Sequence, residues 1–143
     1  MEIVEATDYS EHLKKAMNNF IPQLSSSAAP LDEEFLSTII SSPCVQLFVA
    51  KEDDEYFGCL TLVTFPIPTG IRAWIEDVVV DERARGKGVG RLLSEYAIEV
   101  ARVNGAKTVD LTSRPSRVAA NNLYKDIGFI ERLTNIYRFE GGI

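Results

Sequence analysis

Apolar residues recur along the chain with a period of two in some segments and about 3.6 in others, the spacings of strands and helices. Strands are predicted at residues 2–6, 45–50, 57–65, 71–80, 108–112 and within 130–139, and helices at 11–22, 31–41, 89–101 and 118–127. The first helix is expected to end near Pro22. Phe35 is expected to face the core from the second helix. The predicted order of elements is β-α-α-β-β-β-α-β-α-β.

The segment from Trp74 to Leu93, WIEDVVVDERARGKGVGRLL, carries the strongest chemical signal in the chain. Its first half is rich in β-branched residues, as a buried strand requires, and its second half begins an amphipathic helix. The glycines between them let the backbone approach a ligand, and the N–H groups at the helix start remain free. These donors, the helix dipole and nearby basic side chains would together bind phosphate. The predicted binding residues are Arg85, Gly86, Lys87, Gly88, Val89, Gly90 and Arg91.

The glycine spacing excludes two common nucleotide-binding loops. A nucleoside-triphosphate loop needs Ser or Thr after its lysine, but Gly88 follows Lys87. The dinucleotide fingerprint needs a third glycine where this chain has Arg91. The remaining pattern, R-G-x-G-x-G, resembles the acyl-coenzyme A loop of the GCN5-related N-acetyltransferase (GNAT) family. For this motif taken alone, the alternative is a glycine turn that binds nothing.

A second stretch, TVDLTSRPSRVAANNLYKDIGFI at residues 108–130, carries the same resemblance. Residues 120–129 resemble the A-x-x-L-Y-x-x-x-G-F signature of the GNAT family, and one helix separates the two motifs. The resemblance implies the GNAT fold, an α/β (α+β) arrangement in which helices flank both faces of a mixed central sheet. The predicted order of elements agrees with that fold, and it places the phosphate loop at a carboxyl edge of the sheet.

The resemblance also implies roles for individual residues. A bulge in the strand before the loop would turn a backbone N–H toward the thioester carbonyl, and the strand would pair with the pantetheine arm of acetyl-coenzyme A. Val78, Val79 and Val80 would then lie along the coenzyme, with the oxyanion donor among them. Tyr124 would lie beside the coenzyme sulfur and protonate the departing thiolate. Asn121 would bond the pantetheine amides or cap the preceding loop.

Acyl transfer to an amine also needs a group that accepts a proton. Glu76 is the first candidate for this catalytic base, because it lies in the strand that leads to the phosphate loop. Asp77 and Asp110 are the alternatives. Adjacent carboxylates on a regular strand point to opposite faces, so only one of Glu76 and Asp77 is expected to face the substrate. The structural alternative is a carboxylate paired with Arg72 or Lys107.

Composition and charge narrow the class of protein. A chain of 143 residues with 45% hydrophobic side chains predicts one N-acetyltransferase domain spanning residues 1–143. No apolar run approaches a membrane span, and the first residues do not resemble a signal peptide, so a cytoplasmic protein without a membrane partner is expected. The net charge of −6 opposes binding of nucleic acid. Arg83 and the loop's basic residues form one concentrated basic patch, which suits a small polyanion.

The cysteines and the single histidine argue against metal chemistry. Cys44 and Cys59 are expected to be reduced, buried thiols, as is usual in a reducing compartment. His12 lies far from both motifs and is expected to be a solvated surface residue. Neither a metal site nor a histidine-dependent triad is therefore predicted.

The two motifs do not agree on one acceptor. The run I-E-D-V-V-V-D-E followed by R-G-K-G-x-G is similar to glucosamine-6-phosphate N-acetyltransferases, whereas the second motif differs from theirs. The first hypothesis is acetyl transfer from acetyl-coenzyme A to the primary amine of a small molecule or an amino-sugar phosphate. The alternatives are a protein or peptide N-acetyltransferase and a non-catalytic acyl-coenzyme A-binding regulatory domain. A homodimer is possible.

Overall fold

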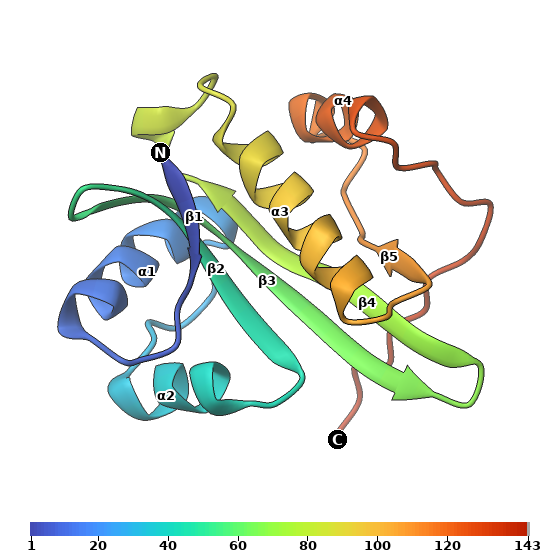
Figure 1. The fold of residues 1–143 in the computed structure, drawn as a ribbon, viewed down its shortest axis with the longest axis horizontal. Helices are drawn as coiled ribbons and strands as arrows, with labels where there is room; N and C mark the ends of the chain where they lie inside the picture. The colour runs from blue at the N-terminus through green and yellow to red at the C-terminus, as the bar shows by residue number, and fades with distance from the viewer. Residues whose placement is uncertain (143) are drawn as a thin grey trace.

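The computed structural model describes residues 1–142, which form a mixed sheet with helices on both faces (Figure 1). The strands lie in the order β1-β2-β3-β4-β5; the pairs from β1 to β4 are antiparallel, and β5 pairs with β4 in parallel. The elements are β1 (Glu2–Glu5), α1 (Glu11–Leu24), α2 (Glu33–Ser41), β2 (Val45–Glu52), β3 (Glu55–Ile67), β4 (Gly70–Val80), the 3-10 turn η1 (Glu82–Ala84), α3 (Val89–Val103), β5 (Thr108–Asp110) and α4 (Val118–Asp126). The predicted α/β fold class is confirmed.

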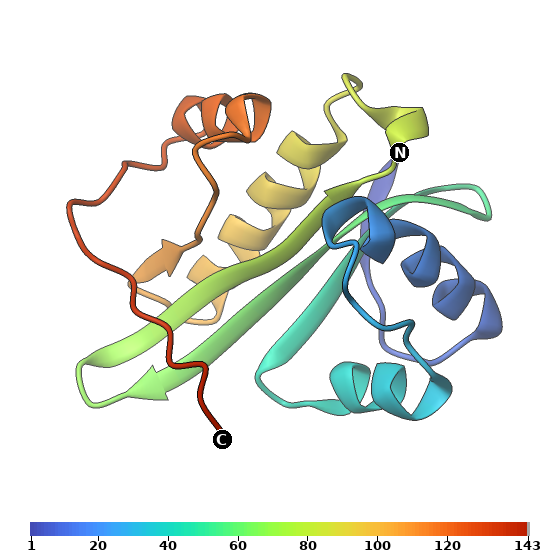
Figure 2. The same ribbon diagram turned by 180° about the vertical axis from the view of Figure 1, so that it is seen from behind.

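Each face of the sheet has its own hydrophobic core. α3 and α4 lie on one face, and α1 and α2 lie on the other, as the two opposite views show (Figures 1 and 2). α3 buries Val89, Leu93, Ala97 and Ala101, which recur every four residues and form one stripe along the helix. The alanines let α3 approach the sheet closely, and full burial of Leu93 contributes about 2 kcal/mol.

The first helix ends near Pro22, as expected, but the proline lies inside the helix. α1 begins after the N-cap Ser10, whose side chain accepts a hydrogen bond from the Leu13 amide, and it continues through Pro22 to Leu24. Pro22 is exposed, so water can reach the carbonyl that its missing N–H leaves without a helical partner. The proline therefore costs α1 little near its C-terminal end.

Two local expectations are wrong. Phe35 is 57% exposed, and its neighbour Leu36 is the residue of α2 that is fully buried. Residues 130–139 contain no strand, and their large apolar side chains are mostly exposed. The sheet edge on this side is β5, which is only 3 residues long and offers few backbone groups for pairing. The elements up to α4 follow the predicted order.

No helix within residues 1–142 is long and apolar enough to cross a membrane.

Candidate functional site

β4 contains a bulge just before it reaches the glycine-rich loop. Thr61 of β3 pairs with Glu76, and Cys59 pairs with Val79, so two residues of β4 lie opposite one residue of β3. Asp77 lies in the bulge with φ of 48°, a left-handed conformation that Asp adopts more readily than most residues. The bulge that the family resemblance implied for this strand is therefore present.

The bulge reverses which side chains face which core. Ile75 packs in the core on the α3 face, whereas Val79 packs in the core on the α1 face. Residues four apart in a regular strand share a face, so the extra residue accounts for the reversal. Glu76 follows Ile75 directly and therefore lies on the α1 and α2 face. The simple expectation that Glu76 and Asp77 take opposite faces does not hold, because Asp77 has left the strand conformation.

One edge of β4 is free over the same stretch. β5 pairs with β4 only from Arg72 to Trp74. Beyond Trp74, no residue of β4 pairs with β5 within residues 1–142. The backbone groups of this edge, from Ile75 to Val80, are therefore available to an extended ligand that pairs as a strand does.

The glycine-rich loop presents a group of free amides at the end of this edge. Gly86 and Gly88 have φ values of 78° and 80°, which only glycine adopts at little cost. A Cβ at either position would meet no atom within 4 Å, so space is open on this side of the loop. Lys87 and Leu92 donate their amides to Ala84 O and Gly88 O, but within the described residues the amides of Gly86, Gly88 and residues 89–91 have no acceptor. Free amides at a helix N-terminus are suited to binding phosphate.

The basic residues around the loop are not equally available. Arg83 donates to Asp81 through its amide, Nε and Nη2, and its guanidinium lies over Phe57. Arg91 is shared between the carboxylates of its ion-pair partners Glu95 and Asp126. Arg83 therefore belongs to the scaffold, which corrects its place in the predicted basic patch.

Arg85 and Lys87 are the exposed cations that can turn toward a ligand at the loop. Arg85 Nη2 lies 3.5 Å from Gln23 Oε1. Neither Arg85 nor Lys87 forms an ion pair within residues 1–142.

Asp81 anchors the start of the loop to α1. The carboxylate is 1% exposed and accepts hydrogen bonds from Arg83 and from Asn19 Nδ2, the latter at 3.2 Å. Gln23, one turn along α1, accepts from the Glu82 amide at 3.1 Å and donates to Asn19 O. Burial alone would raise the pKa of Asp81, but the hydrogen bonds and charge of Arg83 outweigh it and lower that pKa. No role was predicted for these residues, because partners 62 positions apart in the chain carry no local signal.

α4 completes the site beside the start of α3. A Cβ on Gly90 would lie 3.2 Å from Leu123 Cδ2 of α4 and 3.6 Å from Val80 Cγ2 of β4, so Gly90 allows three elements to meet. Tyr124 is partly buried on α4, with its ring edge-on to Phe129. Burial raises the pKa of Tyr124, although the charge of Arg117 opposes this, so the phenol keeps its proton at neutral pH.

Asn121 caps the loop before α4 by donating to Arg114 O at 3.0 Å. The other role considered for Asn121, a bond to the pantetheine amides, stays a prediction.

Glu76 has the environment of a carboxylate that can accept a proton. Partial burial and the neighbouring charge of Asp77 raise the pKa of Glu76 above its ordinary value. Within residues 1–142 neither Glu76 nor Asp77 forms an ion pair, so the structural alternative of pairing with Arg72 or Lys107 is not realised. Asp110, the other candidate, is the last residue of β5 and lies opposite Trp74 in the backbone register of β4 and β5.

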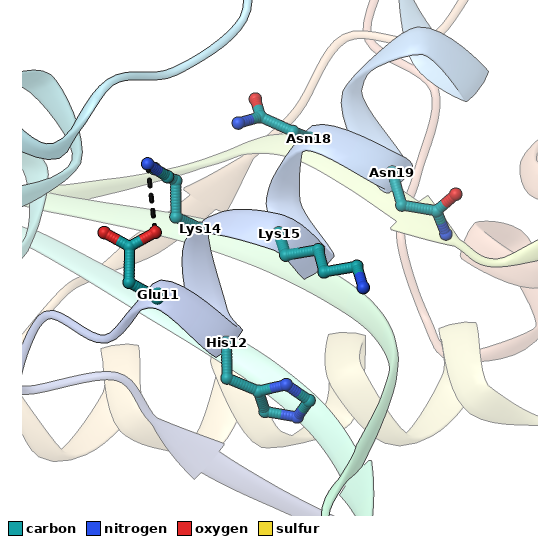
Figure 3. Close-up of a pocket in the computed structure, with 6 residues that line it drawn as sticks. All are labelled: Glu11, His12, Lys14, Lys15, Asn18 and Asn19. Carbon is teal, nitrogen blue, oxygen red and sulfur yellow. Dashed lines mark ion pairs between the residues drawn. The ribbon is translucent and has the colours of Figure 1, made fainter.

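A hollow along the outer side of α1 contains none of the predicted site residues (Figure 3). His12, Lys15 and Asn19 project from one side of the helix there. His12 is exposed, as expected, and its Nε2 is hydrogen-bonded to Asp54 O. Asn19 is engaged with Asp81, so most polar groups of this surface already have protein partners. Within residues 1–142, no group of three or more His, Cys, Asp or Glu side chains could hold a metal ion.

Comparisons with known proteins agree with this geometry. The model of the Acetyltransferase (GNAT) family matches residues 11–129. The chain is 38% identical over 96 residues to the Bacillus subtilis (strain 168) protein named Uncharacterized N-acetyltransferase YhdJ. The aligned residues cover 66% of this chain and 68% of that protein. It is 26% identical over 93 residues to N-alpha-acetyltransferase 30 of Schizosaccharomyces pombe (strain 972 / ATCC 24843), covering 64% and 61% of the two chains.

Solved structures share the fold over nearly the whole chain. Glucosamine-6-phosphate N-acetyltransferase from Arabidopsis thaliana superimposes with a TM-score of 0.80 and 20% identity, covering 97% of this chain and 99% of that one. At this level of identity the likeness concerns the fold.

Proposed function

This chain belongs to the acetyltransferase (GNAT) family and is an acetyltransferase, and we propose that it moves an acetyl group from acetyl-coenzyme A to a primary amine of a small molecule or an amino-sugar phosphate. The observation that carries the proposal is the row of free amides at Gly86, Gly88 and the start of α3, directly beyond the free edge of β4. The family uses acetyl-coenzyme A generally. The loop fits its diphosphate, and the edge fits its pantetheine arm.

The proposed reaction needs three actions from the chain. Glu76, directly or through a water, accepts the proton that the amine loses as its nitrogen attacks the thioester carbon. A backbone N–H among Val78, Val79 and Val80 donates to the carbonyl oxygen while that oxygen carries negative charge. The carbon–sulfur bond then breaks, and Tyr124 gives its proton to the departing thiolate. Tyr124 keeps its proton at neutral pH, as a general acid must.

The acceptor side of the site is proposed to lie on the face that carries α1 and α2. Glu76 lies on this face, and the segment between the two helices lies on it too. Asn18 holds that segment by exchanging two hydrogen bonds with the Leu31 backbone, at 3.0 and 2.8 Å. Acetylation of a peptide N-terminus is the second candidate, favoured by the similarity to N-alpha-acetyltransferase 30. The cytoplasm is the proposed compartment, which suits free thiols; Cys59 is buried as expected, whereas Cys44 is exposed and that expectation is wrong.

A panel of amines tests the proposal. Glucosamine 6-phosphate, aminoglycosides, polyamines, amino acids and short peptides are each incubated with the protein and acetyl-coenzyme A, and release of free thiol is measured. The proposal predicts saturable thiol release with a small amine and its loss in the Glu76→Gln protein. Release with peptides only would move the assignment to the second candidate. Release that is independent of every amine would contradict acetyl transfer to an amine.

A further inference from the structure

Three side chains of β4 form a row on the face of the sheet that carries the proposed base. Arg72, Trp74 and Glu76 are spaced two residues apart before the bulge, so their side chains leave the strand on the same face. Ala73 and Ile75, which alternate with them, pack in the core on the α3 face, and this places the row on the α1 and α2 face. Arg72 and Glu76 are exposed, and Trp74 is partly buried. The row is therefore open to a molecule that approaches Glu76.

The neighbouring strand borders the row with uncharged side chains. Opposite the row, β3 contributes three residues, which are Thr61, Val63 and Phe65. Leu60 and Leu62 alternate with them and pack in the core on the α3 face, so these three share the face of the row. The end of the β3–β4 hairpin extends beyond both α1 and α2 (Figure 2). The segment after α4 crosses this side, but its large apolar side chains are mostly exposed and do not bury the row.

The two ends of the row carry opposite charges. Glu76 lies at one end beside Asp77, and Arg72 lies at the other, and none of the three forms an ion pair within residues 1–142. The Lys107 side chain adds a second cation to the Arg72 end, because a Cβ on Gly70 would lie 3.2 Å from its Cε atom. Four residues of a strand span about 13 Å, and both long side chains can lean along the strand. One small molecule can therefore reach both ends, with an amine at Glu76 and an anionic group at Arg72.

The acidic start of α2 lies away from this row. Glu33 is close to Tyr9, which precedes α1: the pKa of Tyr9 is raised mainly by its hydrogen bond to Glu11, and the charge of Glu33 adds to this. In both views α2 begins at its end farther from β4 (Figures 1 and 2). Glu33 and its neighbour Glu34 therefore do not offset the charge of Arg72 at the acceptor face.

We propose that Arg72 is a specificity-determining residue for the acceptor, and that the enzyme takes a small primary amine with a phosphate or carboxylate group several bonds from the nitrogen. This inference rests on the proposed acetyl transfer and names its substrate class. The planar guanidinium presents paired N–H donors that match the oxygens of either anion. Trp74 offers a flat apolar surface to the part of the acceptor between its two charged groups. Arg72 is remote from the reacting atoms, so it acts on acceptor binding and not on the chemical step.

Matched pairs of acceptors test this assignment. Glucosamine 6-phosphate is compared with glucosamine, and a dipeptide with its C-terminal amide, so each pair differs in the anionic group. For the wild-type protein we expect kcat/KM to be at least about tenfold higher for the charged member of one pair, and the pair that responds identifies phosphate or carboxylate. Arg72→Gln should raise KM for that charged acceptor about 10- to 100-fold, with kcat within about twofold and the neutral acceptor unaffected. Arg72→Lys should recover part of the loss, because it keeps the charge without the paired donors.

Arg102→Gln is the matched control for these measurements. It removes the same charge from α3, on the other face of the sheet, and breaks only an exposed ion pair with Glu99. Equal kcat/KM for the two members of both pairs in the wild-type protein would overturn the assignment. Equal losses in the Arg72→Gln and Arg102→Gln proteins would overturn it as well.

A binding measurement separates this inference from the proposed function. The same four compounds are titrated calorimetrically into protein with excess coenzyme A, which carries no acetyl group to transfer. We expect the charged member of one pair to bind more tightly to the wild-type protein, and this difference to disappear in Arg72→Gln. If the difference is present but no amine supports thiol release, the proposed function fails while the anion site stands. If the members of both pairs bind alike, or none binds, the inference is overturned whether or not thiol is released.

Discussion

Replacement of Asp81 by asparagine tests the scaffold that holds the phosphate loop. The Oδ2 atom of Asp81 accepts from Arg83 Nε at 3.0 Å, from Arg83 Nη2 at 2.8 Å and from Asn19 Nδ2 at 3.2 Å. Oδ1 accepts from the Arg83 amide and caps η1. Asparagine can keep the cap, but its NH2 group would then face three donors where the oxygen now accepts.

The expected loss of stability follows from these contacts. Hydrogen bonds to a charged group contribute about 1.5–3 kcal/mol when buried, but the Arg83 side chain is 53% exposed, so much of its interaction is screened. Together the three contacts of Oδ2 should be worth about 2–3 kcal/mol. For a chain of this length, that loss lowers Tm by about 5–10 °C. Urea unfolding at pH 7 measures the free energy directly.

The pH dependence of this difference has a defined direction. The pKa of Asp81 is lowered below its ordinary value of 3.8, so its contribution is fully present above that value and is lost as pH falls through the folded-state pKa. The wild-type advantage over Asp81→Asn should therefore be constant from about pH 5 to pH 8 and shrink below about pH 4. A difference under about 0.5 kcal/mol at pH 7 would refute the account of Asp81 as a buried anchor.

The remaining predictions concern catalysis and the link to α1. Glu76→Gln should lower turnover while leaving affinity for coenzyme A unchanged, and the acidic limb of the pH–rate profile should disappear. Asp77→Asn should move that limb to lower pH, because the charge of Asp77 helps to raise the pKa of Glu76; an unmoved limb would exclude Glu76 as the titrating group. Tyr124→Phe should keep the thermal midpoint and reduce kcat about 100-fold, and full turnover would leave Tyr124 only a packing role. Gln23→Ala should weaken binding of coenzyme A several-fold in calorimetry, since Arg85 and the Glu82 amide lose their acceptor; unchanged affinity would show that α1 does not support the loop.

The elements near the two sequence motifs could be predicted because their signals are local. The glycine pattern at residues 86–90 depends on backbone conformation, and the structure gives Gly86 and Gly88 the positive φ values that only glycine adopts at little cost. The stripe of α3 follows from spacing in the same way. The presence of the bulge in β4 came from the family resemblance, since β-branched residues at 78–80 also suit a regular strand.

The parts that could not be predicted depend on residues far apart in the chain. Arg83 was grouped with the basic residues of the loop, because a sequence does not show that Asp81 and the Phe57 ring would hold it. The role of Gln23 depends in the same way on a contact between different elements. Phe35 is exposed and Leu36 is buried because of the way α2 meets the sheet. The spacing of apolar residues alone does not show which of these two neighbours faces the sheet.

Calorimetric titration of acetyl-coenzyme A into the Gly88→Asp protein tests the central claim most directly, with Gly88→Asn as its matched control. A side chain at residue 88 would enter open space, and Asn and Asp have similar size and both adopt the left-handed conformation more readily than most residues. Only Asp adds a negative charge where the diphosphate would lie; at about 4 Å, one such repulsion amounts to about 4 kcal/mol at an effective dielectric constant of about 20. The account predicts that Gly88→Asn still binds and that Gly88→Asp binds at least about 100-fold more weakly, with both proteins folded. Equal affinities of the Asn and Asp proteins would contradict the placement of the coenzyme at this loop.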